Sequence, residues 1–478
     1  MDRFDLVIIG AGPAGEAAAF KARALGASVA ILDRDLFGGA CPFFACMPSK
    51  SLLHSAAVHA GGGNYPWPKA SRRRDWMISR KGNDYPDDTR HFRDLEKAGA
   101  VAMRGSARLD GPGRVVVSHD NVEHTIEAGA VIVAVGSVAK VPEMPGLADV
   151  PYWTNREGTS TRELPESLLI LGAGPTGVEL SQVYARYGVP VTLVVPSPRI
   201  LPRDHERSSA AVAKALARDR VTIRTGTRAV AAHAGAGTNG RHRFDLDDGS
   251  SAEGAAVLLA IGRSLPLDGL GLETLGVDIS SGSLKPDAQL RIARGVFVAG
   301  DPAGPEMHTH VSHYEGEMTA RIALGEDVTP DFRAIPRALY TDPETASVGL
   351  LVDEARERGI NAEELTKDLA TTAKGEAAEA EGHVTIVVDR GAGTLVGAFM
   401  AGPGVSEAIH EAVLAVKLQT PLSVLADTIH AFPTVARVLG LLFAEAATSS
   451  RERRGRESLL PVGSPTIAVN SPTSKIAW

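Results

Sequence analysis

Two glycine-rich turns with the same G-x-G-x-x-G spacing constrain the fold of this chain more than any other feature. Each turn follows an apolar run that predicts a β-strand and precedes a segment that predicts an α-helix. In a strand–turn–helix–strand unit, these glycines let the backbone approach a pyrophosphate at the N-terminus of the helix. The repeated pattern therefore predicts an α/β protein with two Rossmann-like dinucleotide-binding domains.

The first unit predicts a site for a dinucleotide whose ribose hydroxyls are free. Strands are expected at 4–9 and 28–32, and the turn Gly10–Gly15 leads into a helix at 16–25. Asp33 follows the second strand, where a carboxylate can accept hydrogen bonds from the ribose. The combination of strand, turn, helix and terminal acid makes dinucleotide binding a specific prediction.

The second unit ends differently, and the difference favours NADPH. Its elements are expected at 168–171, 172–177, 178–187 and 191–195. The last strand ends in Val195, where an acid would favour NADH and repel a 2′-phosphate. Ser197, Arg199 and Arg203 follow and offer a hydroxyl and two cations to that phosphate. The alternative is that these arginines are solvated loop charges, so NADH remains possible.

The chain has only two cysteines, Cys41 and Cys46, and four residues separate them. A disulfide that closes so short a loop restricts the unfolded chain little and therefore adds little stability. The spacing favours a redox-active dithiol that opens and closes during turnover, over the alternative of two unrelated buried thiols. Two dinucleotide sites and a dithiol together predict FAD and NADPH as cofactors, with the flavin linking nicotinamide to sulfur.

The composition argues against several other classes of protein. Hydrophobic residues make up 44% of the chain and charged residues 22%, which is ordinary for a globular protein, and the net charge is −7. This charge gives no attraction to nucleic acid or to an anionic membrane. No apolar run reaches the roughly 18 residues of a spanning helix. Without a leader pattern or a set of structural disulfides, we expect a cytoplasmic protein that binds neither nucleic acid nor membranes.

Further motifs carry a family resemblance. They are C-x4-C-x-P-S-K at 41–50, and the segments 131–137, 257–263, 296–301, 340–344 and 348–350. With the two glycine turns, they make the chain similar to the pyridine nucleotide–disulfide oxidoreductases, which include dihydrolipoamide dehydrogenase, glutathione reductase and mercuric reductase. The resemblance covers about 4–445.

This resemblance implies three domains and a homodimer. The FAD-binding domain is expected at 1–150 and 268–335, with the NAD(P)H-binding domain, 151–267, inserted between its two parts. An α+β dimerisation domain is expected at 336–448. We expect the tail, 449–478, to be poorly ordered.

One internal segment, 61–93, is rich in Gly, Arg, Asp and Trp. It predicts an elaborated connection between two helices of the FAD-binding domain. The sequence leaves open whether this connection is a lid over the substrate or a decoration of the surface.

The resemblance also implies the catalytic residues. Electrons pass from the nicotinamide through the flavin to the disulfide between Cys41 and Cys46. Cys46 is expected beside the flavin, and Cys41 is expected to react with the acceptor. Lys50 is expected beside the flavin N5, paired with Glu179. The alternative is an exposed lysine and a helical glutamate that have no part in the chemistry.

The glycine turns and the two strand ends assign part of the contacts to the cofactors, and the resemblance assigns the others, with Asp301 bonded to the ribityl chain. The residues expected to bind cofactor are Gly10, Gly12, Pro13, Ala14, Gly15, Asp33, Arg34, Gly39, Ala40, Lys50, Ala134, Gly136, Gly172, Gly174, Pro175, Thr176, Gly177, Ser197, Arg199, Gly262, Arg263, Gly300, Asp301, His308, Thr309 and His310.

Three histidines, His308, His310 and His313, lie within six residues and suggest a metal site. Their offsets of two and three do not bring all three onto one face of a helix, so we expect no metal. The resemblance implies instead that a helix begins here, with its N-terminus directed at the flavin pyrimidine.

The chain departs from the family near its C-terminus. The family carries a His-Pro-Thr sequence whose histidine is the general acid–base, and a glutamate five residues later orients that histidine across the dimer. Phe432 and Arg437 occupy these two positions here. His430 lies two residues earlier and could take over only if the loop is reshaped. A positioned acid–base contributes roughly 10²–10⁴-fold to the rate, so its loss would change which acceptors react.

Three functions follow from these expectations. The leading hypothesis is an NAD(P)H:disulfide oxidoreductase that acts on a small disulfide with an atypical acid–base site. The alternatives are an NAD(P)H:quinone reductase that does not need the dithiol, and a redox sensor with little turnover. The apolar segment 42–45 and Phe432 suggest a hydrophobic acceptor, although phenylalanines more often belong to a core. There is no second cysteine pair of the kind that mercuric reductases carry.

Overall fold

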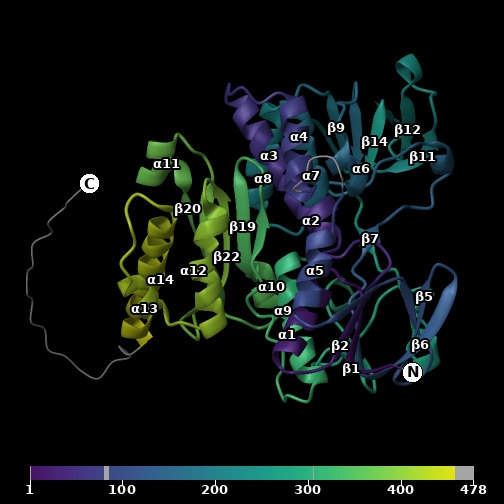
Figure 1. The fold of residues 1–478 in the computed structure, drawn as a ribbon. Helices are drawn as coiled ribbons and strands as arrows, with labels where there is room; N and C mark the ends of the chain where they lie inside the picture. The colour runs from purple at the N-terminus through teal and green to yellow at the C-terminus, as the bar shows by residue number, and fades with distance from the viewer. Residues whose placement is uncertain (1, 80–85, 305, 458–478) are drawn as a thin grey trace, which may run out of the picture.

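The computed structural model describes residues 2–79, 86–304 and 306–457, and it describes side chains up to residue 448. Three α/β units lie next to one another, each built around its own sheet (Figure 1). The predicted α/β class is confirmed. Among the described residues, no helix is both long and apolar enough to cross a membrane.

The first sheet combines two distant parts of the chain. Its strands are β1 (Arg3–Ile9), β2 (Val29–Asp33), β3 (Val101–Arg104), β4 (Ser106–Leu109), β5 (Arg114–His119), β6 (Val122–Val133), β16 (Arg291–Ala293) and β17 (Val296–Val298). The order is β16-β17-β6-β1-β2-β3, with β5 on β6 and β4 on β5. Because β17 pairs in parallel with β6, at Val296 and Val131, the chain returns to this sheet after completing the second unit.

Two helices cover one face of this sheet. They are α1 (Pro13–Ala24), which follows the first glycine turn, and α9 (Thr309–Ala323). The two helices approach so closely that a Cβ at Gly316 would lie 2.2 Å from the carbonyl oxygen of Ala14. Glycine at this position therefore lets the middle of α9 pack directly against the first glycine turn.

The second unit repeats the strand–turn–helix pattern. Its parallel sheet has the order β10-β9-β8-β14, and a separate antiparallel sheet, β11-β12-β13, packs against it. The bounds are β8 (Leu168–Leu171), α7 (Pro175–Arg186), β9 (Val191–Val195), α8 (Glu206–Arg218), β10 (Thr222–Thr225), β11 (Ala229–His233), β12 (His242–Leu246), β13 (Ser251–Gly254) and β14 (Ala256–Leu259). A two-stranded ribbon of β7 (Val138–Ala139) and β15 (Arg263–Ser264) joins the first two units.

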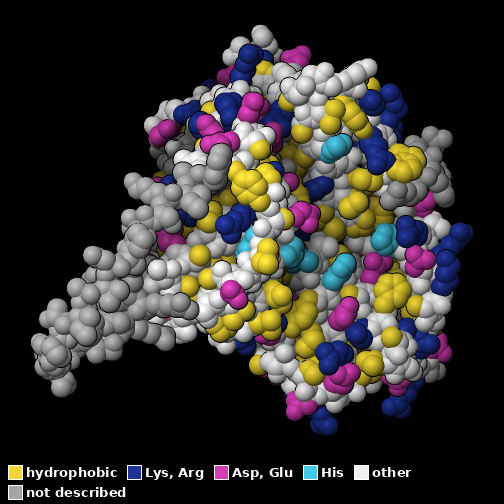
Figure 2. All heavy atoms as spheres, turned by 90° about the vertical axis from the view of Figure 1, so that its left-hand side faces the viewer, with side chains coloured by type: hydrophobic (Ala, Val, Ile, Leu, Met, Phe, Trp, Pro, Cys, Tyr) yellow, Lys and Arg dark blue, Asp and Glu magenta, His cyan; other side chains and the backbone are white. Residues whose placement is uncertain are grey.

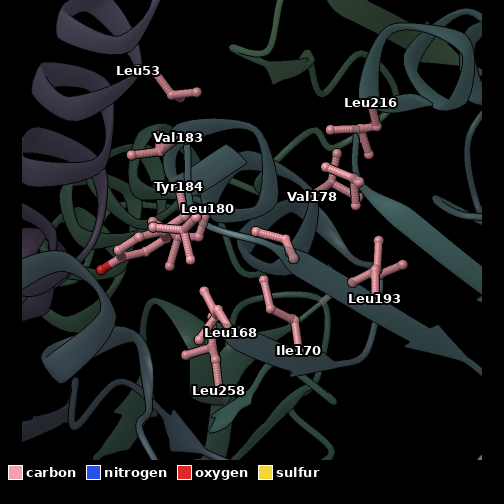
Figure 3. Close-up of a cluster of buried hydrophobic side chains, with 14 of the residues drawn as sticks. Leu53, Leu168, Ile170, Val178, Leu180, Val183, Tyr184, Leu193, Leu216 and Leu258 are labelled. Carbon is pink, nitrogen blue, oxygen red and sulfur yellow. The ribbon is translucent and has the colours of Figure 1, made fainter. Parts of the chain in front are cut away.

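The core of the second unit also anchors a helix from the first part of the chain. Leu53, on α3 (Cys46–Ala60), belongs to the same buried cluster as Leu180 and Tyr184 of α7 (Figure 3). Burial of these side chains fixes the helix that begins at Cys46 against the second unit.

The third unit is an antiparallel sheet in the order β18-β19-β22-β21-β20. Its bounds are β18 (Arg337–Leu339), β19 (Glu344–Gly349), β20 (Ala362–Asp368), β21 (His383–Asp389) and β22 (Thr394–Gly402), with helices α10 (Val352–Glu357), α11 (Ala373–Ala378), α12 (Val405–Leu418), α13 (Leu422–Asp427) and α14 (Val435–Glu457). α14 extends to Glu457, so the first nine residues of the predicted tail are helical, because the helix of the third unit continues into them. The rest of the predicted tail, 458–478, lies outside the described residues.

The connecting segment 61–93 contains α4 (Trp67–Ser79) and the start of α5 (Thr89–Lys97); residues 80–85 lie outside the described part. The helix α4 packs on the second unit. The Trp67 indole donates to the Arg162 carbonyl at 2.9 Å. Arg74, which is fully buried, donates to the carbonyl of Thr159 at 2.7 Å. This half of the segment is therefore a brace between units, a role that neither sequence alternative described.

Most predicted elements of the two glycine units are reproduced within a few residues. β8 and β9 have the predicted bounds. α1 and α7 each begin three residues earlier than predicted, at Pro13 and Pro175. Proline at the first helical position has the backbone angle of a helix and needs no amide hydrogen there, which explains the earlier start.

Candidate active site

The two glycine turns have nearly the same geometry. Gly10 has φ +106°, and a Cβ there would lie 2.3 Å from the carbonyl oxygen of Ala134. Gly172 has φ +102°, and a Cβ would lie 2.4 Å from the carbonyl oxygen of Ala260. Only glycine fits either position, because both the backbone angle and the contact exclude a side chain.

The middle glycine of each turn leaves the space that a pyrophosphate requires. A Cβ at Gly174 would meet nothing within 4 Å, and one at Gly12 would only approach Gly39, at 3.9 Å. No side chain caps the N-terminus of α1 or α7, so the amides of both first turns remain available. These two cradles suit the phosphates of two dinucleotides.

The two strand ends differ as the sequence suggests. The Asp33 carboxylate accepts hydrogen bonds from the amides of Ala11, at 2.7 Å, and Asp35, at 2.8 Å. Burial raises the pKa of Asp33. In the second unit Val195 is buried at the corresponding strand end.

The arginines after Val195 have unequal surroundings. The Arg199 guanidinium donates to the carbonyls of Leu201, Pro202 and Asp204, at 2.9, 2.9 and 2.8 Å. For Arg199 the structure thus favours a loop-bracing role over the predicted contact with a 2′-phosphate. Arg203 is exposed.

The two cysteines lie on adjacent helices. Cys41 belongs to α2 (Ala40–Phe44), and Cys46 begins α3. Both are free thiols, and Cys46 Sγ lies 3.3 Å from the hydroxyl of Thr309, the first residue of α9. The hydrogen bond from Cys41, with those of Thr309 and the charge of Lys50, lowers the pKa of Cys46 to about 6 against the effect of burial. The same sulfur–sulfur hydrogen bond, together with burial, raises the pKa of Cys41.

An ion pair between a half-buried lysine and a buried glutamate lies next to the dithiol. Lys50 Nζ donates to both carboxylate oxygens of Glu179, at 2.9 and 2.8 Å. The glutamate side chain is 5% exposed, and the amide of Tyr340 also donates to it, at 3.2 Å. The Tyr340 ring lies 4.9 Å from Lys50 Nζ. Three units of the chain thus meet at one carboxylate.

The second unit also holds the loop between the cysteines. The side chains of Asn155 and Thr159, on α6 (Asn155–Ser160), donate to the carbonyl of Phe44 at 2.8 and 3.2 Å. The Phe44 ring lies under the Arg156 guanidinium, and Phe43 is buried. The loop is therefore fixed from both sides, and Phe43 belongs to the core.

A second polar cluster lies at the end of β17. Ser137 donates to the Asp301 carboxylate, and the Arg263 guanidinium lies 3.6 Å from it. Beneath them, the fully buried Glu315 accepts a hydrogen bond from the amide of Gly300 at 2.7 Å. Burial raises the pKa of Glu315 to about 8, so this carboxyl holds its proton at neutral pH.

The histidine cluster is occupied by protein contacts. His308 Nε2 lies 2.9 Å from Glu306, and His310 Nε2 lies 2.8 Å from the carbonyl oxygen of Pro336. His313 is exposed. The described residues contain no group of three metal-ligating side chains. As expected, α9 begins here, at Thr309, and no side chain caps it.

His430 does not lie at the position of the family's acid–base, which Phe432 occupies in the sequence. His430 Nε2 lies 2.7 Å from Glu411 on α12, and its side chain is 4% exposed. Gly440 on α14 makes room for the ring, since a Cβ there would lie 2.5 Å from Nδ1. Nδ1 is buried and makes no hydrogen bond with the described residues. Phe432 is 74% exposed. The catalytic role expected for His430 is therefore not supported, because the ring packs inside its own unit.

The remaining predicted cofactor residues lie around the two turns and the polar cluster. Arg34 is exposed directly after β2, and Gly136 and Gly262 flank the ribbon strands β7 and β15. Sequence reasoning missed the contact of Thr309 with sulfur, the buried Glu315, and a pair formed by His91 and Glu16 at 2.9 Å. No local signal marks these contacts, because each joins residues on different elements.

The fold and the site define a class of two-nucleotide oxidoreductases with a dithiol, and comparison with known families gives the same answer. The family model described as pyridine nucleotide-disulphide oxidoreductase matches residues 4–316, and the dimerisation domain of that family matches 335–442. This chain belongs to the pyridine nucleotide-disulphide oxidoreductase family. It is an FAD-dependent enzyme that uses a pyridine nucleotide.

Several known proteins are similar over nearly the whole chain. A dihydrolipoyl dehydrogenase of Thermus scotoductus is 34% identical, over 94% of this chain and 98% of its own length. Dihydrolipoyl dehydrogenase 3 of Pseudomonas aeruginosa is 33% identical, over 92% and 97%. Among solved structures, LpdA from Mycobacterium tuberculosis is 26% identical, covers 94% of this chain and 99% of its own, and has a TM-score of 0.83. The flavoprotein disulfide reductase RclA from Escherichia coli, 23% identical with a TM-score of 0.83 and coverage of 93% and 100%, shares the fold.

Proposed function

We propose that this flavoprotein transfers electrons from NADPH to a small disulfide through Cys46 and then Cys41. When bound, FAD accepts a hydride from the nicotinamide and delivers two electrons to the neighbouring sulfurs. The observation that carries the proposal is the environment of Cys46, which lies 3.3 Å from the Thr309 hydroxyl and whose pKa is lowered to about 6. A thiolate is the reactive form in disulfide exchange.

The two cysteines take different roles in the reaction because their pKa values shift in opposite directions. Cys46 keeps its thiolate beside Thr309 and Lys50, whereas burial and the bond to Cys46 keep the proton on Cys41. Glu179 holds Lys50 in place by an ion pair, and the Lys50 charge lowers the pKa of Cys46 while the Glu179 charge opposes it. Cys41 becomes the attacking thiolate once its proton leaves, and Cys46 then closes the internal disulfide.

We propose the domain division 1–150 with 268–335, 151–267 and 336–448, and a homodimer formed through the third unit. The match to the dimerisation domain of the family supports this assembly. Hydrophobic side chains are exposed on α12, α13 and α14 and on the loop between the last two: Leu414, Leu418, Val424, Ile429, Phe432 and Leu441. Figure 2 shows hydrophobic and histidine side chains at the surface of this side of the molecule. A second copy would cover that apolar surface.

In this dimer, Phe432 replaces the acid–base of the family, so acceptors that need a proton at that position would react slowly. The site residues that we propose for cofactor and catalysis are those assigned by resemblance, with Arg203 in place of Arg199 at the 2′-phosphate and without His430.

Anaerobic reduction with one equivalent of NADPH tests the proposal. We expect a long-wavelength thiolate–flavin absorbance, and turnover of small disulfides that Cys41→Ser abolishes. Quinone reduction that survives loss of both cysteines, without disulfide turnover, would instead establish a quinone reductase. A protein that takes up no flavin would refute both assignments.

A further inference from the structure

A buried carboxyl lies next to the first glycine turn, and the function above does not use it. The carboxyl belongs to Glu315 on α9, whose side chain is fully buried. Its Oε2 accepts a hydrogen bond from the amide of Gly300 at 2.7 Å. Its Oε1 is also buried and makes no hydrogen bond with the described residues. The side chain is therefore anchored through one oxygen, and ionisation would leave the other oxygen charged and without a donor.

The backbone around this carboxyl contacts the first glycine turn. A Cβ at Gly300 would lie 3.1 Å from the Cβ of Ala14. A Cβ at Gly316, the residue after Glu315, would lie 2.2 Å from the carbonyl oxygen of Ala14. Ala14 belongs to the first turn of α1, whose uncapped amides suit a pyrophosphate. The Glu315 carboxyl thus lies where the end of β17, the middle of α9 and the start of α1 meet.

The charge next to this carboxyl is negative. Asp301 directly follows Gly300 at the end of β17. Burial and the Asp301 charge raise the pKa of Glu315 to about 8, and the hydrogen bond from Gly300 opposes them. A pyrophosphate bound at the first turn of α1 would add further negative charge. An ionised Glu315 would be repelled by Asp301 and by the phosphates, whereas the neutral acid would not.

The other charged side chains at this junction have partners of their own. On β6, the side chain that shares a buried cluster with Ala14 and with α9 is the apolar Ile132. None of the described groups that shift the pKa of Glu315 is a cation. The charged residues of α1, of α9 and of the end of β17 form pairs: Glu16 with His91 at 2.9 Å, Lys21 with Glu317 at 3.5 Å, and Asp301 with Arg263 at 3.6 Å.

We propose that FAD binding at the first glycine turn requires the proton on Glu315, so that ionisation of this carboxyl weakens the binding of FAD. The inference rests on the proposed function, which places FAD at this turn. Bound phosphates would raise the pKa of Glu315 further, so the affinity for FAD falls as pH rises through the lower pKa of the flavin-free protein. A further rise of one pKa unit corresponds to about tenfold in affinity.

Release of FAD from the holoenzyme tests this inference. The holoenzyme is diluted at a series of pH values, and the fluorescence of free FAD gives the dissociation constant at each. For wild type we expect the dissociation constant to rise about tenfold between about pH 7 and about pH 9.5. Glu315→Gln carries no charge and keeps a carbonyl oxygen for the amide of Gly300. We expect this variant to match wild type at neutral pH and to change little with pH.

Two further variants separate the charge from other effects. Glu317→Gln is the matched control, because Glu317 lies on the same helix but pairs with Lys21 at the surface. It should lose FAD at alkaline pH as wild type does. Glu315→Met is neutral but cannot accept the hydrogen bond from Gly300. We expect it to bind FAD more weakly at every pH, without the alkaline loss.

An alkaline loss of FAD in Glu315→Gln or Glu315→Met as large as in wild type would overturn the inference. A wild-type dissociation constant that does not change with pH would also overturn it. Both results would leave the proposed function standing, because the protein would still bind flavin. A purified wild-type protein that takes up no flavin at neutral pH would instead refute the proposed function itself.

Discussion

The two ends of the electron path differ in how closely they follow the family pattern. At the dithiol, side chains from three helices form two contacts. Cys46 lies within hydrogen-bonding distance of Thr309, and Lys50 pairs with Glu179. At the C-terminal segment, Phe432 is exposed and His430 is turned inward to Glu411. Under the proposed function, the residues that pass electrons to the dithiol are retained, whereas the residues that would assist transfer to the acceptor differ from the family pattern.

The largest effect is expected at the retained end. Cys46→Ser removes the only sulfur that contacts Thr309 among the described residues, so we expect complete loss of disulfide turnover and of the charge-transfer absorbance. Flavin reduction by NADPH should persist, and stopped-flow absorbance measures both. Disulfide turnover that survives in this variant would show that the dithiol is dispensable. Thr309→Ser, which keeps the hydroxyl, is the control.

Restoring the family's histidine and glutamate tests the proposed change at the C-terminal segment. Phe432→His combined with Arg437→Glu should raise dihydrolipoamide oxidation by about 10²-fold, the lower end of what a positioned acid–base supplies. Steady-state rates at several pH values measure the gain. Phe432→Leu with Arg437→Glu is the matched control. A double variant that folds, dimerises and shows no gain contradicts the assignment of Phe432 to the acid–base position.

Loss of the lysine charge tests how the retained end is tuned. Lys50→Met removes a charge that lowers the pKa of Cys46 and leaves Glu179 buried without its partner. We expect the pH midpoint of the charge-transfer absorbance to rise above about 6, with Lys50→Arg close to wild type. An unchanged midpoint in Lys50→Met would show that the Lys50 charge does not lower the pKa of Cys46.

A smaller effect is expected where the two nucleotide units differ. Arg203→Ala should weaken NADPH binding by about fivefold, near 1 kcal/mol, because an exposed charge contact is worth little more. NADH binding should not change, and titration with each nucleotide distinguishes the two. Arg199→Ala is the comparison, since its guanidinium braces its own loop and should reduce thermal stability more than NADPH selectivity. Equal weakening of both nucleotides by Arg203→Ala would show that Arg203 does not contact the 2′-phosphate.

The smallest effect on turnover is expected at His430. His430→Ala removes the bond to Glu411 and empties space beside Gly440, so we expect a loss of about 1–3 kcal/mol of stability. The turnover number of the folded dimer should match wild type. Thermal unfolding and active-site-normalised rates measure these two quantities. A folded variant with a large fall in turnover would show that His430 has a catalytic role.

The sequence predicted elements better than contacts. A glycine turn marks where one strand ends and the next helix begins, and β8 and β9 have the predicted bounds. The Lys50–Glu179 pair, 129 residues apart in the chain, was accessible only through family resemblance. Nothing in the sequence placed His91 on Glu16, because the pair depends on how α5 lies against α1. Nor did it show that Gly440 would let His430 turn inward.

The central claim is a thiolate on Cys46 beside the flavin, and a pH titration of the two-electron-reduced protein tests it most directly. The pKa of Cys46 is lowered to about 6, so the charge-transfer absorbance should be fully developed above this pH and disappear as pH falls through it. A midpoint near that of an ordinary thiol, or no such absorbance at any pH, would contradict the account.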